Sequence, residues 1–260
     1  MPIDPALIDI DFAKQPEYTM GNLGPGPARF RGFSDAVKVI PESEWKELIE
    51  RLNTDKSGCA SLVTRIYDQK QEGSCVANAS CQANEIVQAV QFGKDRVVPL
   101  SAISLYKRIG RSPSSGAMVS DGLKESIDLG ILPLDTQTNR EKFGDKVMPN
   151  TGFREPFPAD WENTANYFRA LEWLEIKSTA ELISALLQRF PVVVGRQGHS
   201  ICYCEPLYKD GELLVKYANS WGDWGDNGYG YDSQSQIKQS ASSGAFALRA
   251  VTYPTFQEVT

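Results

Sequence analysis

The stretch Gln69-Lys70-Gln71-Glu72-Gly73-Ser74-Cys75-Val76-Ala77-Asn78-Ala79 decides how the rest of the chain is interpreted. Apolar residues recur at helical spacing from Ser74 to about Val90, which predicts an amphipathic helix with Cys75 in its first turn. The positive end of a helix dipole favours a thiolate over a thiol, and the thiolate is the reactive form. A cysteine in this place is also compatible with a small buried apolar residue. Cys75 is therefore a candidate nucleophile that needs partners elsewhere in the chain.

The chain has a single histidine, His199, between Gly198 and Ser200 at the start of a predicted strand. Asn219 ends the neighbouring predicted strand, so the two side chains can face each other. The amide oxygen of Asn219 can accept the Nδ1–H of the imidazole, which leaves the other ring nitrogen for a thiol. Trp221 is placed to shield that hydrogen bond from water. The alternative is a histidine satisfied at a strand end, beside a glycine-rich turn with structural tryptophans.

Taken in order, these segments resemble the papain/cathepsin family of cysteine peptidases. Gly73-Ser74-Cys75 is similar to the family's Gly-Ser-Cys, and Gln69 to its oxyanion-hole glutamine. The segments around the family's histidine and asparagine correspond to Gly198-His199-Ser200 and Asn219-Ser220-Trp221-Gly222. Weaker likenesses are Leu100-Ser101, which opens the next helix, and Gly116-Ala117, which stands where the family has a Gly-Gly strand that pairs with the substrate backbone. The likeness covers residues 69–230.

Four features depart from the family pattern. Glu72 stands where the family has a cysteine disulfide-bonded within the helical half, and Val76 replaces the aromatic residue that follows the nucleophile. The turn after Trp221 is one residue short. The N-terminal arm is also too short and too rich in glycine and proline to resemble the helical propeptide of secreted members.

The resemblance implies a cysteine endopeptidase in which Cys75 and His199 form a thiolate–imidazolium pair. Cys75 would attack a peptide carbonyl, His199 would protonate the leaving amine, and water would hydrolyse the thioester. Gln69 and the Cys75 backbone N–H would hold the oxyanion, while Asn219 orients the imidazole. The residues expected to bind substrate are Gly116, Ala117, Gly198 and Trp221. No metal or other cofactor is implied, because Cys202 and Cys204 lack a second pair to complete a zinc site.

Composition restricts the function classes. A length of 260 residues allows a sizeable core, and 41% hydrophobic with 23% charged residues is ordinary for a globular protein. A net charge of −6 argues against nucleic acid as a partner. No apolar run is long enough to span a membrane, and the first residues lack the apolar core of a signal peptide. Five cysteines in a chain without an export signal predict free thiols and a cytoplasmic location.

The order of predicted elements favours an α+β fold of the papain-like kind. Residues 1–57 form an extended arm with a short helix near 42–52, and residues 58–260 form the peptidase domain. Within it, a helical half at about 58–150 precedes a β-rich half at about 151–260, described as an antiparallel, barrel-like sheet. A capping box at Ser178 opens a helix to about Phe190, and Asp210-Gly211 joins two strands of a hairpin. The active-site cleft is expected between the halves.

The predicted partner is a protein or peptide substrate, but other interpretations stay open. The same thiol–imidazole chemistry serves other acyl transfers, such as amidation or transglutamination. A structural or assembly protein that kept the fold without proteolysis is the alternative from another class, because the Gly/Pro-rich arm is suited to pack on neighbouring subunits. The chain also resembles peptidase-like proteins of bacteria and their phages, some of them carried in the virion.

Overall fold

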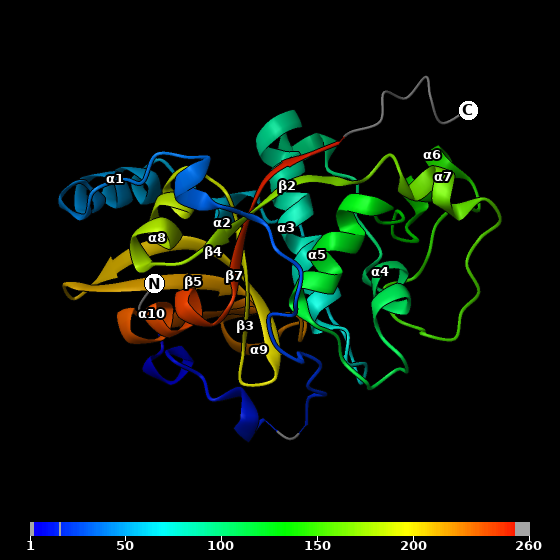
Figure 1. Cartoon of the computed structure of the whole chain (residues 1–260), viewed down its shortest axis with the longest axis horizontal. Helices are drawn as coiled ribbons and strands as arrows, with labels where there is room; N and C mark the ends of the chain where they lie inside the picture. The colour runs from blue at the N-terminus through cyan, green and yellow to red at the C-terminus, as the bar shows by residue number, and fades with distance from the viewer. Residues whose placement is uncertain (1–2, 16, 253–260) are drawn as a thin grey trace.

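The computed structural model describes residues 3–15 and 17–252. Its helices alternate with loops through the first two thirds of the chain and with strands through the rest (Figure 1). In chain order the α-helices are α1 (Glu42–Thr54), α2 (Cys59–Leu62), α3 (Cys75–Phe92), α4 (Ala102–Ile109), α5 (Val119–Asp128), α6 (Gln137–Phe143), α7 (Trp161–Ala165), α8 (Thr179–Leu187), α9 (Trp224–Asn227) and α10 (Gln234–Ser243). Over the described residues, no helix is both long and apolar enough to cross a membrane.

The strands form one seven-stranded sheet in the order β1-β2-β7-β3-β4-β5-β6. They are β1 (Arg31–Gly32), β2 (Ala170–Ile176), β3 (Val192–Arg196), β4 (His199–Lys209), β5 (Glu212–Ala218), β6 (Tyr229–Ser233) and β7 (Ala245–Val251). Only the short β1 runs parallel to its neighbour, and every other pair is antiparallel. The predicted α+β fold, with a helical part beside an antiparallel sheet, is confirmed.

The sheet separates two hydrophobic cores, because successive side chains of a strand point to opposite faces. On one face Val193, Cys202 and Cys204 pack into the core built around α3, α4 and α5. On the other face Val194 and Tyr203 pack with residues of α1, α8 and α10. Figure 1 shows α3 to α7 on the right and the sheet, with its other helices, on the left. The strands that meet α3 therefore lie at the boundary of the two parts.

Local sequence signals explain several boundaries. Ser178 caps α8 through a 3.2 Å bond from the Glu181 N–H to its hydroxyl, as the capping box predicts. That helix ends at Leu187, before the predicted Phe190, and Arg189 has a φ of 62° that no helix allows. The hairpin turn is confirmed, since Asp210 and Gly211 both have positive φ between β4 and β5.

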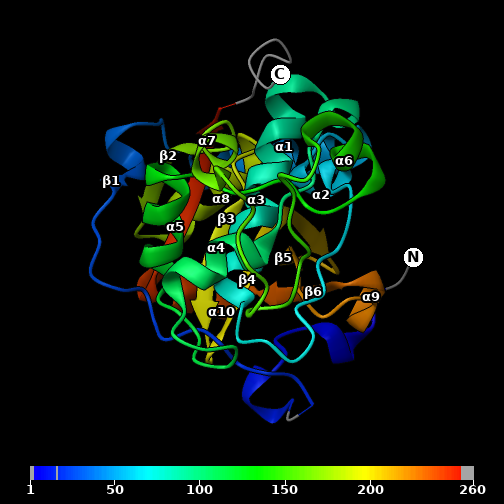
Figure 2. The ribbon, with the colours of Figure 1, turned by 90° about the vertical axis from the view of Figure 1, so that its right-hand side faces the viewer.

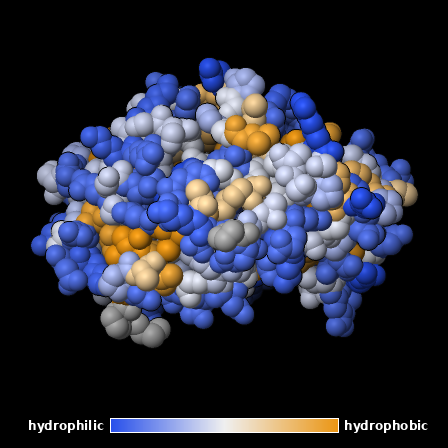
Figure 3. Space-filling model, turned by 90° about the horizontal axis from the view of Figure 1, so that it is seen from below, coloured by the Kyte–Doolittle hydropathy of each residue, from blue (hydrophilic) through white to orange (hydrophobic). Residues whose placement is uncertain are grey.

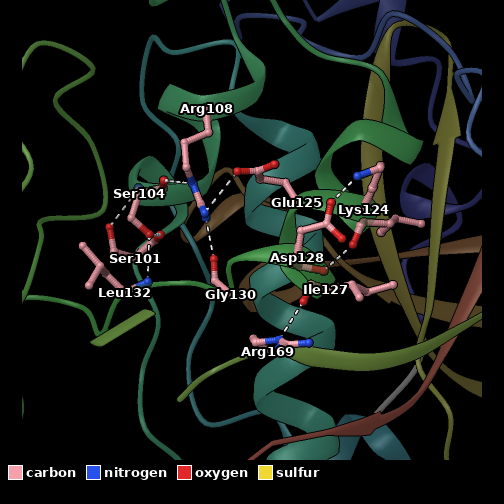
Figure 4. A network of polar contacts seen from close by, with 12 residues as sticks. Ser101, Ser104, Arg108, Lys124, Glu125, Ile127, Asp128, Gly130, Leu132 and Arg169 are labelled. Atoms are coloured by element: carbon pink, nitrogen blue, oxygen red, sulfur yellow. Dashed lines mark hydrogen bonds and ion pairs between the residues drawn. The ribbon is translucent and has the colours of Figure 1, made fainter. Parts of the chain in front are cut away.

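A polar network fixes α4 and α5 to each other (Figure 4). Arg108 of α4 pairs with Glu125 of α5 at 3.2 Å and also donates to the carbonyls of Ser104 and Gly130. Arg169 reaches the Ile127 carbonyl at 2.7 Å, which ties the end of α5 to the approach to β2. Burial lowers the pKa of Arg108 to about 10. This network holds in place the helix that directly follows Gly116 and Ala117.

The N-terminal arm wraps around one side of the molecule before α1. It runs along the bottom of Figure 1, and the turned view in Figure 2 shows it continuing up to β1. Its helix α1 does not stand apart, because Trp45 and Ile49 are buried in the same core as Leu182. The arm faces the viewer in Figure 3, where hydrophilic residues cover most of the surface and hydrophobic ones gather in patches.

Candidate active site

The predicted nucleophile lies at the boundary of the two parts of the fold. Cys75 is the first residue of α3, after the N-cap Ser74, and its side chain is fully buried. Backbone groups of Ser200 and Gly21 lie close enough to the sulfur to lower the pKa of the thiol, although burial outweighs them. Ser200 directly follows His199 at the start of β4. The fold thus brings the beginning of α3 and the beginning of β4 together around one thiol.

The predicted imidazole and carboxamide are in contact. His199 Nε2 lies 2.7 Å from Asn219 Oδ1, and both side chains are buried. Because Oδ1 is an acceptor, Nε2 carries the proton of this bond. The prediction that Nδ1 would make the bond is wrong. Nδ1 is instead the nitrogen left over, and among the described residues it has no hydrogen-bond partner, the Cys75 sulfur included.

Burial keeps both reactive groups neutral in this arrangement. It raises the pKa of the Cys75 thiol to about 12, despite the backbone hydrogen bonds that favour the thiolate. It lowers the pKa of the His199 imidazole to about 4, an effect that the nearby Arg196 charge adds to and the Asn219 bond opposes. The thiolate–imidazolium pair stays a prediction for an uncovered centre.

Gln69 is fully buried six residues before Cys75, and both ends of its amide are engaged. Its Oε1 accepts from the Ser220 hydroxyl at 2.6 Å, and its Nε2 donates to the carbonyls of Thr19 (2.9 Å) and Glu72 (2.7 Å). Ser220 therefore fixes the orientation of the Gln69 amide, with Oε1 toward the Ser220 hydroxyl and Nε2 toward the two carbonyls. Ser220 belongs to the segment Asn219-Ser220-Trp221-Gly222, but no role was predicted for it from the sequence. Its signal was its position next to Asn219.

Glu72 makes a non-covalent link at the position where the sequence suggested a lost disulfide. Its Oε1 accepts the backbone N–H groups of Gly152 and Phe153, each at 2.9 Å. The loop that carries Gln69 is thereby tied to the long segment before α7. All five cysteines of the chain lie in the described residues, and all are free, buried thiols, as predicted.

A segment of the arm, residues 18–24, covers the candidate site, and we call it the strap. Tyr18 stacks on Trp221 with ring centroids 4.0 Å apart and 6° between the planes. Gly21 and Asn22 donate their backbone N–H groups to the Gly198 carbonyl at 3.0 and 2.7 Å. The strap thus lies between the turn before His199 and the start of α3, where the cleft was predicted.

The residues predicted to bind substrate all touch the strap. Ala117 donates to the Gly21 carbonyl at 2.7 Å and accepts from Leu23 at 2.9 Å, so this segment pairs with the chain's own backbone. The bridge at this point, between Asn22 and Ala117, is parallel. Gly116 has a φ of 69°, and a Cβ there would lie 2.5 Å from the Gly21 oxygen. The Gly198 carbonyl accepts from Gly21 and Asn22 of the strap, and the Trp221 ring stacks on Tyr18.

Gly21 fits where no larger residue would. A Cβ added to it would lie 2.0 Å from the carbonyl oxygen of Gly73, two residues before Cys75. Real Cβ atoms do not approach backbone this closely, so a side chain at residue 21 would push the strap away from α3. The sequence identified the Gly/Pro-rich stretch as an extended arm but gave no sign of where it packs.

In the described part of the chain, no group of three or more His, Cys, Asp or Glu side chains is placed to hold a metal ion. The chemistry that the geometry offers belongs to the side chains themselves. A thiol opens α3, an imidazole at the start of β4 has its Nε2 held by an amide, and a second, buried amide lies six residues before the thiol. Such a set suits acyl transfer through a thioester.

Comparison with known proteins identifies the fold of the chain. No protein-family model matches the chain, and no curated protein does so significantly. Solved structures do match. A digestive procathepsin L2 proteinase from the larval midgut of Tenebrio molitor has a TM-score of 0.65 at 15% identity, over 94% of this chain and 81% of that one. Xylellain, a cysteine protease from Xylella fastidiosa, has a TM-score of 0.59 at 17% identity, over 92% of this chain and 98% of that one. The chain therefore has the fold of the papain-like cysteine proteases.

Proposed function

We propose that the protein is a cysteine endopeptidase and that the structure is its latent form. The observation that carries the proposal is the 2.7 Å contact between His199 and Asn219, beside a thiol at the first position of α3. In the proposed reaction Cys75 is the nucleophile and His199, through Nδ1, is its base. Asn219 orients the imidazole, and Gln69 with the Cys75 backbone N–H binds the oxyanion.

Latency accounts for the covered, neutral centre. A fully buried thiol cannot reach a peptide, and the strap occupies the backbone groups of Ala117 and Gly198 that a substrate would need. Several similar structures are likewise named as precursors, including stem bromelain and the ragweed allergen Amb a 11 in its proform. When the strap lifts, water reaches the sulfur, and proton transfer from the thiol to His199 becomes favourable.

Labelling of Cys75 with an epoxide thiol inhibitor tests the proposal. Gly21→Ala, which displaces the strap, should speed the labelling and give cleavage of an unstructured protein such as casein. Cys75→Ala in the same background should abolish both. Cleavage that persists without the thiol would contradict the assignment. Gln69→Ala should retain labelling but lower the turnover by roughly 10² to 10³.

The alternative is an assembly protein in which the arm contacts partner subunits and little proteolysis occurs. It is favoured by the fact that Cys75 is completely covered in the structure. A Cys75 that stays unreactive in Gly21→Ala, although the strap has moved, would support this alternative. The proposed location is a reducing one, cytoplasmic or within a virion, and the five free thiols support it.

A further inference from the structure

The arm also reaches the catalytic imidazole through a second segment, residues 8–12, which we call the clamp. Its last residue, Phe12, is fully buried although it lies only a few residues from the N-terminus. The Phe12 ring meets the His199 ring edge-on, with centroids 4.8 Å apart and 70° between the planes. It also meets Trp221 at 5.4 Å. Since His199 and Trp221 lie 4.6 Å apart, the three rings touch pairwise.

The backbone of Phe12 is fixed at the same place. Its N–H donates to Gln197 Oε1 at 2.8 Å. Gln197 and Gly198 form the turn between β3 and β4, both with positive φ, and His199 is the next residue. Phe12 thus contacts the imidazole directly and also binds the turn that delivers it.

The Phe12 ring also contacts one member of a buried ion pair. The Arg196 guanidinium lies 4.4 Å from the ring centroid and pairs with Asp232 at 2.9 Å, and both side chains are almost wholly buried. Tyr217 of β5 lies 6.1 Å from the same ring. The packing of Phe12 against Arg196 and His199 fills the space through which water would otherwise reach the imidazole.

The clamp is tied to the edge of the sheet independently of the strap. Ile8 forms a parallel bridge with Tyr231 of β6, and the Asp9 N–H donates to the Tyr231 carbonyl at 2.9 Å. The Asp9 carboxylate accepts from the Ser233 N–H and hydroxyl at 2.7 and 2.6 Å. The strap has none of these partners, so its backbone contacts can break while the clamp stays in place.

From these contacts we infer that Phe12 is a positioning residue for His199 and that the clamp is part of the working active site, so that activation lifts the strap and leaves residues 8–12 bound. The inference rests on the proposed function for its kinetic consequence only. Phe12 acts by holding the imidazole in the plane of its bond to Asn219 and by excluding water from it. The pKa of His199 is lowered mainly by burial, which is consistent with the packing of Phe12 on the imidazole.

The test uses the fact that His199 is the only histidine, so a single imidazole titrates in the NMR spectrum of the full chain. Phe12→Ala should raise the pKa of His199 by about one pH unit, because water reaches the ring. Phe12→Leu should leave that pKa low, since it retains most of the apolar volume. The matched control is Phe33→Ala, which removes an equally buried ring from the same core away from the imidazole. If Phe12→Ala does not fold, Phe12→Val gives a smaller shift in the same direction.

The kinetic measurements are made in the Gly21→Ala background, where the strap is displaced. There Phe12→Ala should lower kcat about tenfold with little change in KM, and Phe12→Leu should restore it. The inference is overturned if folded Phe12→Ala has the same His199 pKa and the same kcat as Phe33→Ala. If Phe12→Ala shifts the pKa of His199 but the Gly21→Ala chain cleaves no peptide, the positioning role is supported and the proposed peptidase is refuted.

Discussion

The strap and the clamp lie within one short stretch of chain and contact the same turn, yet they are held by different forces. The strap is bound mainly through backbone hydrogen bonds, together with the stacking of Tyr18 on Trp221, and its Leu23 side chain is 60% exposed. The clamp is bound through a buried ring and a carboxylate at the sheet edge. Each backbone bond exchanges for one to water at a net cost of about 0.5–1.5 kcal/mol, whereas exposing a buried phenylalanine costs more. These costs are the reason we propose that the strap opens while the clamp stays bound.

The largest difference between the two segments is expected when the clamp is weakened. Phe12→Ala deletes a fully buried side chain and should lower the free energy of unfolding by about 3–5 kcal/mol. Leu23→Ala in the strap should change it by less than about 0.5 kcal/mol. Urea unfolding followed by circular dichroism measures both. Equal effects from the two variants would show that the distinction between clamp and strap is wrong.

The next effect is on access to the thiol. Gly21→Ala places a Cβ against the Gly73 carbonyl and should increase the rate of Cys75 alkylation by roughly 100-fold, which corresponds to losing two or three backbone bonds. Iodoacetamide labelling, located by mass spectrometry, gives the rate. Leu23→Ala serves as the control in the same segment and should label as slowly as the unmodified chain. A slow rate in Gly21→Ala would mean that something other than the strap protects the sulfur.

A smaller effect is expected in the pH dependence of that labelling. In the covered chain, burial raises the pKa of Cys75 to about 12, so alkylation should still be increasing with pH at pH 10. Displacing the strap hydrates the sulfur, and the pKa should fall toward or below the ordinary thiol value. The profile of Gly21→Ala should then level off at lower pH than that of Leu23→Ala. Superimposable profiles would count against burial as the cause.

The smallest expected effect concerns the edge of the clamp. Asp9→Ala removes two hydrogen bonds to Ser233 at an exposed site and should cost about 1 kcal/mol in unfolding free energy. Asp4→Ala, which loses only a bond to the nearby Ala6 N–H, is the matched control. Differential thermal melting detects the difference. An Asp9→Ala chain as stable as Asp4→Ala would indicate that Phe12 alone holds the clamp.

The sequence predicted the elements whose signals are local. The amphipathic pattern after Ser74 and the capping box at Ser178 each involve residues within one helix, so they can be recognised without the fold. The hairpin turn at Asp210-Gly211 is local for the same reason. The order of Gln69, Cys75, His199 and Asn219 also indicated which segments belong to one site. Which imidazole nitrogen faces Asn219 was predicted wrongly, because it depends on the rotation of a side chain.

From the residues alone came the fold class, which is confirmed, and the candidate site residues, which stay a prediction. The packing of residues 18–24 against the segment before Cys75, and of Phe12 on the imidazole, could be seen only in the folded chain. Most contacts of the strap are made by backbone groups, which every residue has and which therefore leave no pattern in a sequence. Phe12 and His199 are separated by most of the chain, and a contact at that separation exists only when the whole sheet has formed.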